Sequence, residues 1–329
     1  MMAATGADSP RTILVYVGLD LMGDGLMKLP FVRALRAAFP GARITWLAGK
    51  GRTVYASTLK PLVAGLIDET LEDADIGSRA AELLRRPLRG RRFDLIIDTQ
   101  RRILTTLILR RIAHGRFLSA AADYRLSDIK PARPAQKPPA LIRQLLDLVE
   151  LASGRPAEPH RAAELPAAAI ARARELLPSA RIYVGLAPGA GGRHKCWPLE
   201  NFMALARQQI DRGRIPAFIL GPDESDWLGA LQAAIPGAVF PLQDAASADP
   251  LLTVALAGRM AAAVANDSGG GHLLAAGGVP LVSLFGPTSP AKFAPLAAKL
   301  TVVTAQEFGR DEMAAIPVDA VAAAVERLL

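Results

Sequence analysis

The chain has 329 residues, a formal net charge of +8 and a single cysteine, and 51% of its residues are hydrophobic although only 5% are aromatic. This length exceeds what one core usually serves and predicts two domains of roughly 150 residues each. One cysteine, Cys196, excludes an internal disulfide and is typical of a reducing compartment, and the four histidines lack the spacing of metal ligands. No signal pattern and no apolar stretch of about 18 residues is present, so we expect a cytoplasmic protein without a structural metal.

In the first half, apolar β-rich runs alternate with helical patterns, which is typical of an α/β domain with a parallel sheet. The predicted elements are strands at Ile13–Val17, Ile44–Leu47 and Leu95–Ile97 and helices at Phe31–Phe39, Ile103–Ile112 and Leu141–Leu148. Proline-rich passages at 131–140 and 153–160 then interrupt the alternation. We therefore assign residues 1–165 to an N-terminal doubly wound domain.

The alternation resumes in the second half and predicts a second domain of the same class over residues 166–310. Its predicted elements are, in chain order, Ile182–Ala187, Phe202–Ile210, Ala217–Leu220, Leu251–Arg259, Ala261–Ala265, His272–Ala276 and Leu281–Phe285. Within residues 311–329, the amphipathic stretch Val318–Leu329 predicts a terminal helix, for which packing back towards the N-terminal domain is one option.

The excess of positive charge lies wholly in the first half of the chain. Residues 1–150 hold 24 Lys and Arg against 15 Asp and Glu, whereas residues 151–329 hold 15 against 16. Arginine clusters at 85–92 and 101–116 can attract polyanions. Nucleic acid is one candidate, but no aromatic-interleaved basic motif accompanies the clusters; an anionic membrane surface or a phosphorylated lipid headgroup fits as well. A solvated basic face without a partner is the alternative.

Ligands of doubly wound sheets gather at the carboxyl ends of strands, so the loops after strands are the first candidates for function. After the first predicted strand, the sequence GDG at 23–25 comes just ahead of a helix expected to open at residues 28–30. A substrate hydroxyl can approach a carboxylate between two glycines at such a junction, which makes Asp24 a candidate general base. A helix N-cap is the alternative role for Asp24, and Asp20 is a weaker candidate for the base.

A second loop, PGAGGRHKCWP at 188–198, combines glycines with basic side chains. Gly191 and Gly192 allow a ligand to approach the backbone closely, and the ammonium group of Lys195 can neutralise a diphosphate oxygen. Arg193 is a weaker second cation. The loop lacks the GK[ST] ending of a Walker loop, so the pattern predicts phosphate binding of another kind.

Two further loops carry acidic and hydroxyl side chains. In GPDES at 221–225, Asp223 or Glu224 could accept hydrogen bonds from ribose hydroxyls, with helix capping as the alternative. In the segment 266–288, Asp267 and Ser268 end a predicted strand, and the next helix has a positive end that suits phosphate. That helix is preceded by Gly269, Gly270, Gly271 and His272. An ordinary strand-to-helix turn is the alternative, but the acidic, hydroxyl and imidazole groups together favour a site.

These loops occur in the order found in one known family. The stretches at 13–47, 93–100, 187–206 and 266–295 resemble the ADP-heptose:lipopolysaccharide heptosyltransferases, the family nine glycosyltransferases, almost end to end. The resemblance implies GT-B architecture, with two Rossmann-like doubly wound parallel-sheet domains facing across a cleft. It implies an inverting, metal-independent transferase without a cofactor that moves heptose from ADP-heptose to an anionic lipid-linked or glycan acceptor. With this acceptor, the basic first half would face the inner surface of the cytoplasmic membrane, and a peripheral location there is one option for a cytoplasmic protein. We expect no nucleic-acid partner; the sequence leaves the oligomeric state open, with a monomer favoured.

The family's functional residues can be carried over one at a time. Asp24 matches the catalytic base, Lys195 the lysine that contacts the donor phosphate, and Asp267 an aspartate near the donor sugar. Residues 268–272 match the loop and helix start that hold the diphosphate, and either acid of the 221–225 loop matches the residue that binds ribose. Acceptor binding is assigned to Lys28, Arg101 and Arg102.

Several positions depart from the family pattern. Where heptosyltransferases can carry hydroxyl residues near the start of the phosphate loop, this chain has Ala190, Gly191 and Gly192. Cys196 replaces an arginine that many members have, and Gly270 and Gly271 replace a proline-methionine pair. These changes leave open a different nucleotide-sugar donor, and a non-catalytic sugar-nucleotide-binding protein and a nucleotide-sugar epimerase are the rival functions. An NAD-dependent oxidoreductase is disfavoured because no GxGxxG motif follows the first strand.

Overall fold

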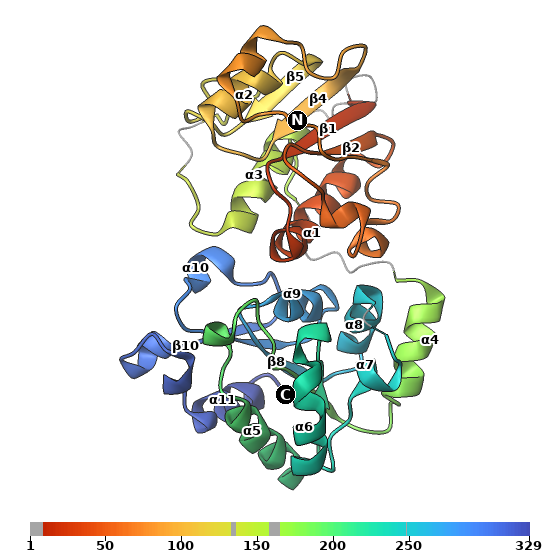
Figure 1. Cartoon of the computed structure of the whole chain (residues 1–329), viewed down its shortest axis with the longest axis vertical. Helices are drawn as coiled ribbons and strands as arrows, with labels where there is room; N and C mark the ends of the chain where they lie inside the picture. Colours follow the sequence, from red (N-terminus) through yellow and green to blue (C-terminus); the bar gives the residue numbers. More distant parts are fainter. Residues whose placement is uncertain (1–8, 133–135, 158–164, 248) are drawn as a thin grey trace. The chain divides into compact units, whose positions relative to one another are not determined.

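The computed structural model describes residues 9–132, 136–157, 165–247 and 249–329, so parts of both proline-rich passages lie outside the described residues. Contacts divide the chain into two compact units, Met1–Arg161 and Ala162–Leu329. Each unit contains a sheet of five parallel strands with helices packed against it (Figure 1). The predicted fold class, two doubly wound parallel-sheet α/β domains, is confirmed.

The sheet of the first unit has the strand order β3-β2-β1-β4-β5. Its strands are β1 (Thr12–Val17), β2 (Arg43–Ala48), β3 (Glu69–Leu71), β4 (Arg92–Asp98) and β5 (Ala113–Ser119). Its helices are α1 (Met22–Ala38), α2 (Ile103–Leu109) and α3 (Leu141–Ser153), with short 3-10 turns η1 (Val54–Ala56), η2 (Lys60–Val63) and η3 (Ala80–Leu84). Helices α1 and α3 pack against each other, and η3 packs against α2.

The sheet of the second unit has the order β10-β9-β8-β6-β7. Its strands are β6 (Tyr183–Ala187), β7 (Ile215–Phe218), β8 (Ala262–Asn266), β9 (Leu281–Phe285) and β10 (Leu300–Thr304). Its helices are α4 (Ala167–Leu176), α5 (Leu199–Asp211), α6 (Leu228–Ala234), α7 (Pro241–Asp244), α8 (Pro250–Ala257), α9 (Gly269–Ala276), α10 (Pro290–Phe293) and α11 (Val318–Glu326). Its 3-10 turns are η4 (Arg193–Lys195), η5 (Pro222–Trp227), η6 (Ala305–Phe308) and η7 (Met313–Ala315).

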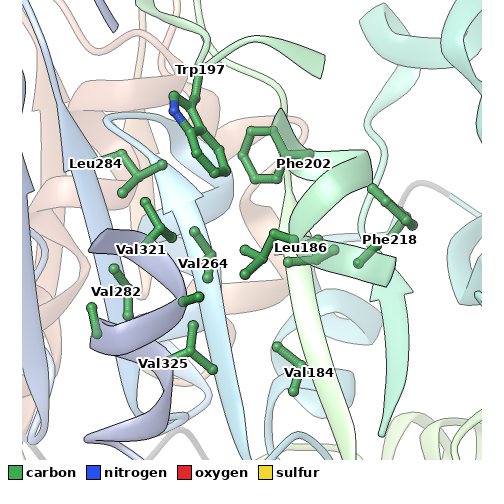
Figure 2. Packing of buried hydrophobic residues seen from close by; sticks show 14 of the residues in the cluster. Val184, Leu186, Trp197, Phe202, Phe218, Val264, Val282, Leu284, Val321 and Val325 are labelled. Atoms are coloured by element: carbon green, nitrogen blue, oxygen red, sulfur yellow. The ribbon is translucent and has the colours of Figure 1, made fainter. Parts of the chain in front are cut away.

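Side chains of both sheet faces are buried, which explains why the central strands read as continuous apolar runs. On one face of the second sheet, Val184 and Leu186 of β6 pack with Phe202 of α5 and with Val321 and Val325 of α11 (Figure 2). Helices α4, α8 and α9 cover the other face. The predicted terminal helix, α11, therefore lies in the core of the second unit.

Helix α1 begins at Met22, earlier than the predicted opening at residues 28–30. The glycines around Asp24 and the proline at position 30 are typical of a loop, yet all of them lie within the helix. Close packing explains this, because Tyr55 donates its hydroxyl to the carbonyl of Gly25 at 2.6 Å, and a β-carbon on Gly25 would stand 2.5 Å from Cγ2 of Val54. Asp24 thus lies in the first turn of α1 rather than ahead of it, and Leu21 occupies the N-cap position.

Close packing of α8 against α9 depends on Gly277 at the end of α9. A β-carbon there would stand 2.5 Å from that of Ala257 and would also clash with the carbonyl oxygen of Val254. We expect Gly277→Ala to lower the free energy of unfolding by about 1–3 kcal/mol, measured by urea denaturation.

The matched control for this substitution is Gly270→Ala in the same helix. A β-carbon on Gly270 would meet Ala187 and Ser268 at an ordinary 3.5 Å. Because alanine favours helix over glycine by up to about 1 kcal/mol, this variant should unfold at the same or slightly higher urea concentration. Equal destabilisation of the two variants would contradict the packing argument.

Candidate active site

Each sheet contains one switch point, where the order of connections reverses and the loops of neighbouring strands leave in opposite directions. It lies between β6 and β8 in the second unit and between β1 and β4 in the first. Ligands of doubly wound sheets bind outside the carboxyl ends of strands at such points. Most candidate residues follow these four strands, whereas Asp223 and Glu224 follow β7. The topology therefore places one candidate ligand-binding edge in each unit.

Lys195 and Asp267 bring the loops after β6 and β8 together. Nζ of Lys195 lies 3.6 Å from Oδ2 of Asp267, and the hydroxyl of Thr288 donates to the same oxygen at 2.7 Å. The ammonium group keeps contact with solvent and has donors left for a ligand. Two predicted site residues therefore form one polar group at the switch point.

The start of α9 adds backbone donors to this group. Ser268 is the N-cap, and its hydroxyl oxygen accepts the N–H of Gly271 at 3.4 Å. Gly269 and Gly270 complete the first turn, whose positive end favours an anion. Burial lowers the pKa of the His272 imidazole to about 4, against the opposing effect of Asp267. His272 is therefore neutral at pH 7 and offers a hydrogen bond, which leaves Lys195 as the cation of the group.

Asn266 at the end of β8 holds the loop that carries Lys195. Its buried side chain donates to the carbonyl of Pro188 at 2.7 Å and accepts the N–H of Trp197 at 3.0 Å. Trp197 is itself buried and donates its indole N–H to the carbonyl of Ile316 at 2.9 Å. Both ends of the loop are thus bonded to one side chain.

Neither Asn266 nor Thr288 was a predicted site residue, although both lie in the segment 266–288. A signal for Asn266 exists, because an amide at the end of an otherwise apolar buried strand must find hydrogen-bond partners. Thr288 carries no comparable signal, since its contact with Asp267 joins two loops that the sequence cannot place side by side.

The other side chains of the loop after β6 have different surroundings. The Arg193 guanidinium lies 4.2 Å from the ring centroid of Trp227 and 3.1 Å from a carboxylate oxygen of Asp226. Gly191 is exposed with open space around it, whereas Gly192 lies against the ring of His194. The Arg193 guanidinium therefore contacts Trp227 and Asp226 and not Asp267, and the backbone at Gly191 is accessible to a ligand.

Of the two acids in the 221–225 loop, Glu224 lies nearer the candidate site. Its carboxylate accepts the N–H of Gly221 at 2.9 Å and lies against Gly189, where a β-carbon would collide with it. Burial raises the pKa of Glu224. Asp223 is exposed. The contact with the loop after β6 favours Glu224 as the acid that binds a ribose.

In the first unit, Asp24 and Asp20 have opposite environments. Asp24 is half-buried, and its carboxylate forms no hydrogen bond or ion pair with any residue that the structure describes. Asp20 is buried and accepts hydrogen bonds from Lys28 at 2.7 Å, Trp46 at 2.9 Å and Thr53 at 2.8 Å. A base needs an uncommitted carboxylate, so the geometry favours Asp24 over Asp20.

The same contacts correct the assignment of Lys28 to acceptor binding. Its ammonium group is buried and neutralises the Asp20 carboxylate, so it is committed within the core of the first unit. A buried charge pair of this kind holds the loop after β1 against η1.

Asp98 ends β4 and holds the turn that leads to the two predicted acceptor-binding arginines. The buried carboxylate accepts the N–H of Gln100 at 2.9 Å and the hydroxyls of Thr106 at 2.7 Å and Ser119 at 3.0 Å. The two arginines follow directly. Arg101 lies 3.8 Å from Asp123, and Arg102 is exposed at the N-cap of α2.

Burial raises the pKa of Asp98 to about 6, although its three hydrogen bonds oppose the shift. A carboxyl group with a raised pKa stabilises the fold at low pH, and this contribution is lost as the pH rises through about 6. Asp98→Asn keeps the shape without the charge. As the pH rises from roughly 4 to 7.5, the wild type should therefore lose stability that the variant keeps. The free energy of unfolding of Asp98→Asn, relative to that of the wild type, should rise by up to about 3 kcal/mol over this interval, measured by urea denaturation.

Asp94→Asn on the same strand is the control. The backbone N–H of Arg11 and other donors lower the pKa of Asp94, so this group stays ionised over the same interval. Its difference from the wild type should be nearly constant there. A constant difference for Asp98→Asn as well would contradict the assignment of the titration to Asp98.

The described residues contain neither a membrane-spanning helix nor a cluster of metal ligands. No helix among the described residues has the length and apolar character needed to cross a bilayer. Nor do three or more His, Cys, Asp or Glu side chains of that set gather in a geometry that could hold a metal ion.

Comparisons with known proteins point to one family. The model of glycosyltransferase family 9 (heptosyltransferase) matches residues 82–314. Lipooligosaccharide heptosyltransferase 2 of Haemophilus influenzae is 34% identical over 127 residues, which are 37% of this chain and 36% of that relative. The chain thus aligns with little more than a third of this curated relative.

Solved structures resemble nearly the whole chain. A glycosyl transferase family 9 structure from Veillonella parvula has a TM-score of 0.72 at 20% identity and covers 98% of this chain and 97% of its own. The E. coli heptosyltransferase WaaC with ADP has a TM-score of 0.66 at 19% identity and covers 97% and 100%. The likeness confirms the GT-B fold expected from the sequence.

Proposed function

Because the chain belongs to glycosyltransferase family 9, the heptosyltransferases, we propose that it transfers a sugar, heptose from ADP-heptose, to a lipopolysaccharide core or a related glycan acceptor. The second unit binds the nucleotide-sugar donor and the first unit binds an anionic acceptor at the inner membrane surface. The reaction inverts the anomeric configuration and needs no metal.

In this reaction Asp24 takes the proton of an acceptor hydroxyl as the oxygen attacks the anomeric carbon of the donor. The bond from that carbon to the diphosphate breaks, and the nucleoside diphosphate leaves from the opposite face with the bonding electrons. Lys195 and the N–H groups at the start of α9 stabilise the charge that grows on the leaving diphosphate. A cation and backbone donors thus do what a metal does in other transferases.

The convergence of Lys195, Asp267 and the first turn of α9 at one switch point carries this proposal. A cation beside backbone N–H groups suits a diphosphate, and Glu224 at the neighbouring loop suits a ribose. WaaC, a structural neighbour, was solved with ADP, which supports an adenine nucleotide as the donor of this chain.

A thermal-shift panel of ADP-heptose and UDP-, GDP- and dTDP-sugars tests the donor. A ligand that binds only the native state stabilises it by RT ln(1 + [L]/Kd), so at equal concentrations the tightest-binding ligand gives the largest rise in melting temperature. We expect that ligand to be ADP-heptose. A larger shift with another nucleotide sugar would overturn the choice of donor. Release of ADP only in the presence of an acceptor, undiminished by EDTA, would separate a transferase from an epimerase and from a non-catalytic binding protein.

A further inference from the structure

The first unit presents exposed aliphatic side chains where η3 packs against α2. Leu84 is 87% exposed, and Ile103 and Leu107 of α2 are 55% and 38% exposed. Ile103 and Leu107 stand four residues apart and lie on one face of the helix. Their neighbours Leu83 and Leu104 point the other way and pack against the hydrophobic core. The exposed leucines and isoleucine therefore lie on the solvent side of two elements whose other side packs against the core.

Exposed arginines follow these aliphatic side chains in the sequence. Arg85, Arg86 and Arg89 follow Leu84 in the chain, are exposed, and form no ion pair with any carboxylate in the described part of the protein. Arg111, beyond the end of α2, is exposed as well and donates weakly to the carbonyl of Arg85 at 3.5 Å. We call Leu84, Arg85, Arg86, Arg89, Ile103 and Leu107 the η3–α2 surface.

The segment that carries this surface has a fixed shape. The carboxylate of Glu82 accepts three backbone N–H groups, of Gly77 at 2.7 Å, Ser78 at 3.1 Å and Arg79 at 2.6 Å. The one acid between residues 79 and 92 is thus turned to the backbone and does not neutralise the arginines. Leu88 packs against the core after the first two arginines and fixes the far end of the segment.

We propose that the η3–α2 surface docks the protein on an anionic lipid bilayer. Arginines beside a bilayer are attracted to anionic headgroups, and aliphatic side chains between them gain by entering the acyl region. A single-stranded nucleic acid favours aromatic side chains on which bases stack, and the exposed large apolar residues of this surface are all aliphatic. The proposal goes beyond the transfer reaction and does not depend on it, because vesicle binding needs neither donor nor acceptor.

Flotation of the full chain with lipid vesicles tests the charge component. The protein should float with phosphatidylcholine vesicles that contain roughly 30% phosphatidylglycerol and not with phosphatidylcholine alone, and added salt should release it. Replacing Arg85, Arg86 and Arg89 together by Ala should lower the partition coefficient on the order of a hundredfold, since each arginine contributes about fivefold.

The control replaces Arg174, Arg181 and Arg310 by Ala. These arginines are exposed in the second unit and change the net charge by the same amount. This variant should float like the wild type. Equal losses in both triple variants would overturn the proposal, because binding would then depend on net charge alone.

A tryptophan at position 84 tests whether the η3–α2 surface inserts into the bilayer. Emission of Leu84→Trp should shift to the blue with the anionic vesicles, whereas that of Ile182→Trp, at an exposed apolar position of the second unit, should not. Vesicle-bound protein with unshifted Leu84→Trp emission would overturn the η3–α2 surface as the docking site. All substituted positions are exposed, and circular dichroism would verify that the variants fold.

Discussion

Asp24→Asn is expected to lower the transfer rate by about 10²- to 10⁴-fold, the usual contribution of a positioned general base. The Asp24 carboxylate has no partner among the described residues and lies in the first turn of α1, so the amide can replace it without breaking a contact. Affinity for the nucleotide-sugar donor should change by less than about threefold, because the residues proposed to bind it lie on the loops after β6 and β8. The two measurements are the initial rate of ADP release with acceptor and calorimetric titration with donor.

Asp20→Asn is the control that separates chemistry from folding. It leaves the buried Lys28 ammonium without its counter-charge and should lower the free energy of unfolding by about 3–5 kcal/mol. Asp24→Asn should melt at nearly the wild-type temperature. Wild-type turnover by Asp24→Asn would remove Asp24 as the base, and a large drop in its melting temperature would mean that the carboxylate has a structural role instead.

Lys195→Met should weaken both donor binding and turnover, with a combined loss on the order of 10²- to 10³-fold in kcat/KM. Methionine keeps much of the length and removes the charge that stands 3.6 Å from Asp267. Donor binding then brings a diphosphate to a site where Asp267 is left uncompensated, and the leaving group forms without its cation. Calorimetry with ADP, together with steady-state rates at saturating donor, would resolve the two effects.

Arg193→Met is the matched control, a cation in the same 3-10 turn. Its guanidinium is engaged with Trp227 and Asp226, so its removal should change kcat/KM by less than about threefold. A loss equal to that of Lys195→Met would show that the loop acts through its total charge rather than through one placed ammonium group.

The sequence predicted the interior of the fold better than its edges. Central strands β1, β4, β6 and β8 are buried on both faces and appear as continuous apolar runs. Strands β3, β5 and β10 were not predicted, because each lies at the edge of its sheet and keeps partly exposed residues that break the apolar pattern. A strand that is stabilised on one side only needs less apolar sequence, and its pattern is correspondingly weak.

Site residues were predictable as far as their loops follow strands, and no further. Glycine content and strand ends made Lys195, Asp24 and Asp267 candidates, but the partners of these side chains depend on which loops meet in space. Lys28 illustrates the limit, since its pairing with Asp20 is set by the start of α1, which glycines and a proline concealed. The choice between Asp223 and Glu224 likewise required the contact with Gly189.

The two bonds of the Asn266 side chain have a consequence for how the site recognises its ligand. They join the loop after β6 to the strand that presents Asp267, so the loop is already held in place before a ligand binds. The conformational entropy of ordering these loops is then lost during folding and not when the donor arrives. Association of the donor with these two loops should accordingly resemble binding to a preformed site, with fast, single-phase kinetics and no slow ordering step.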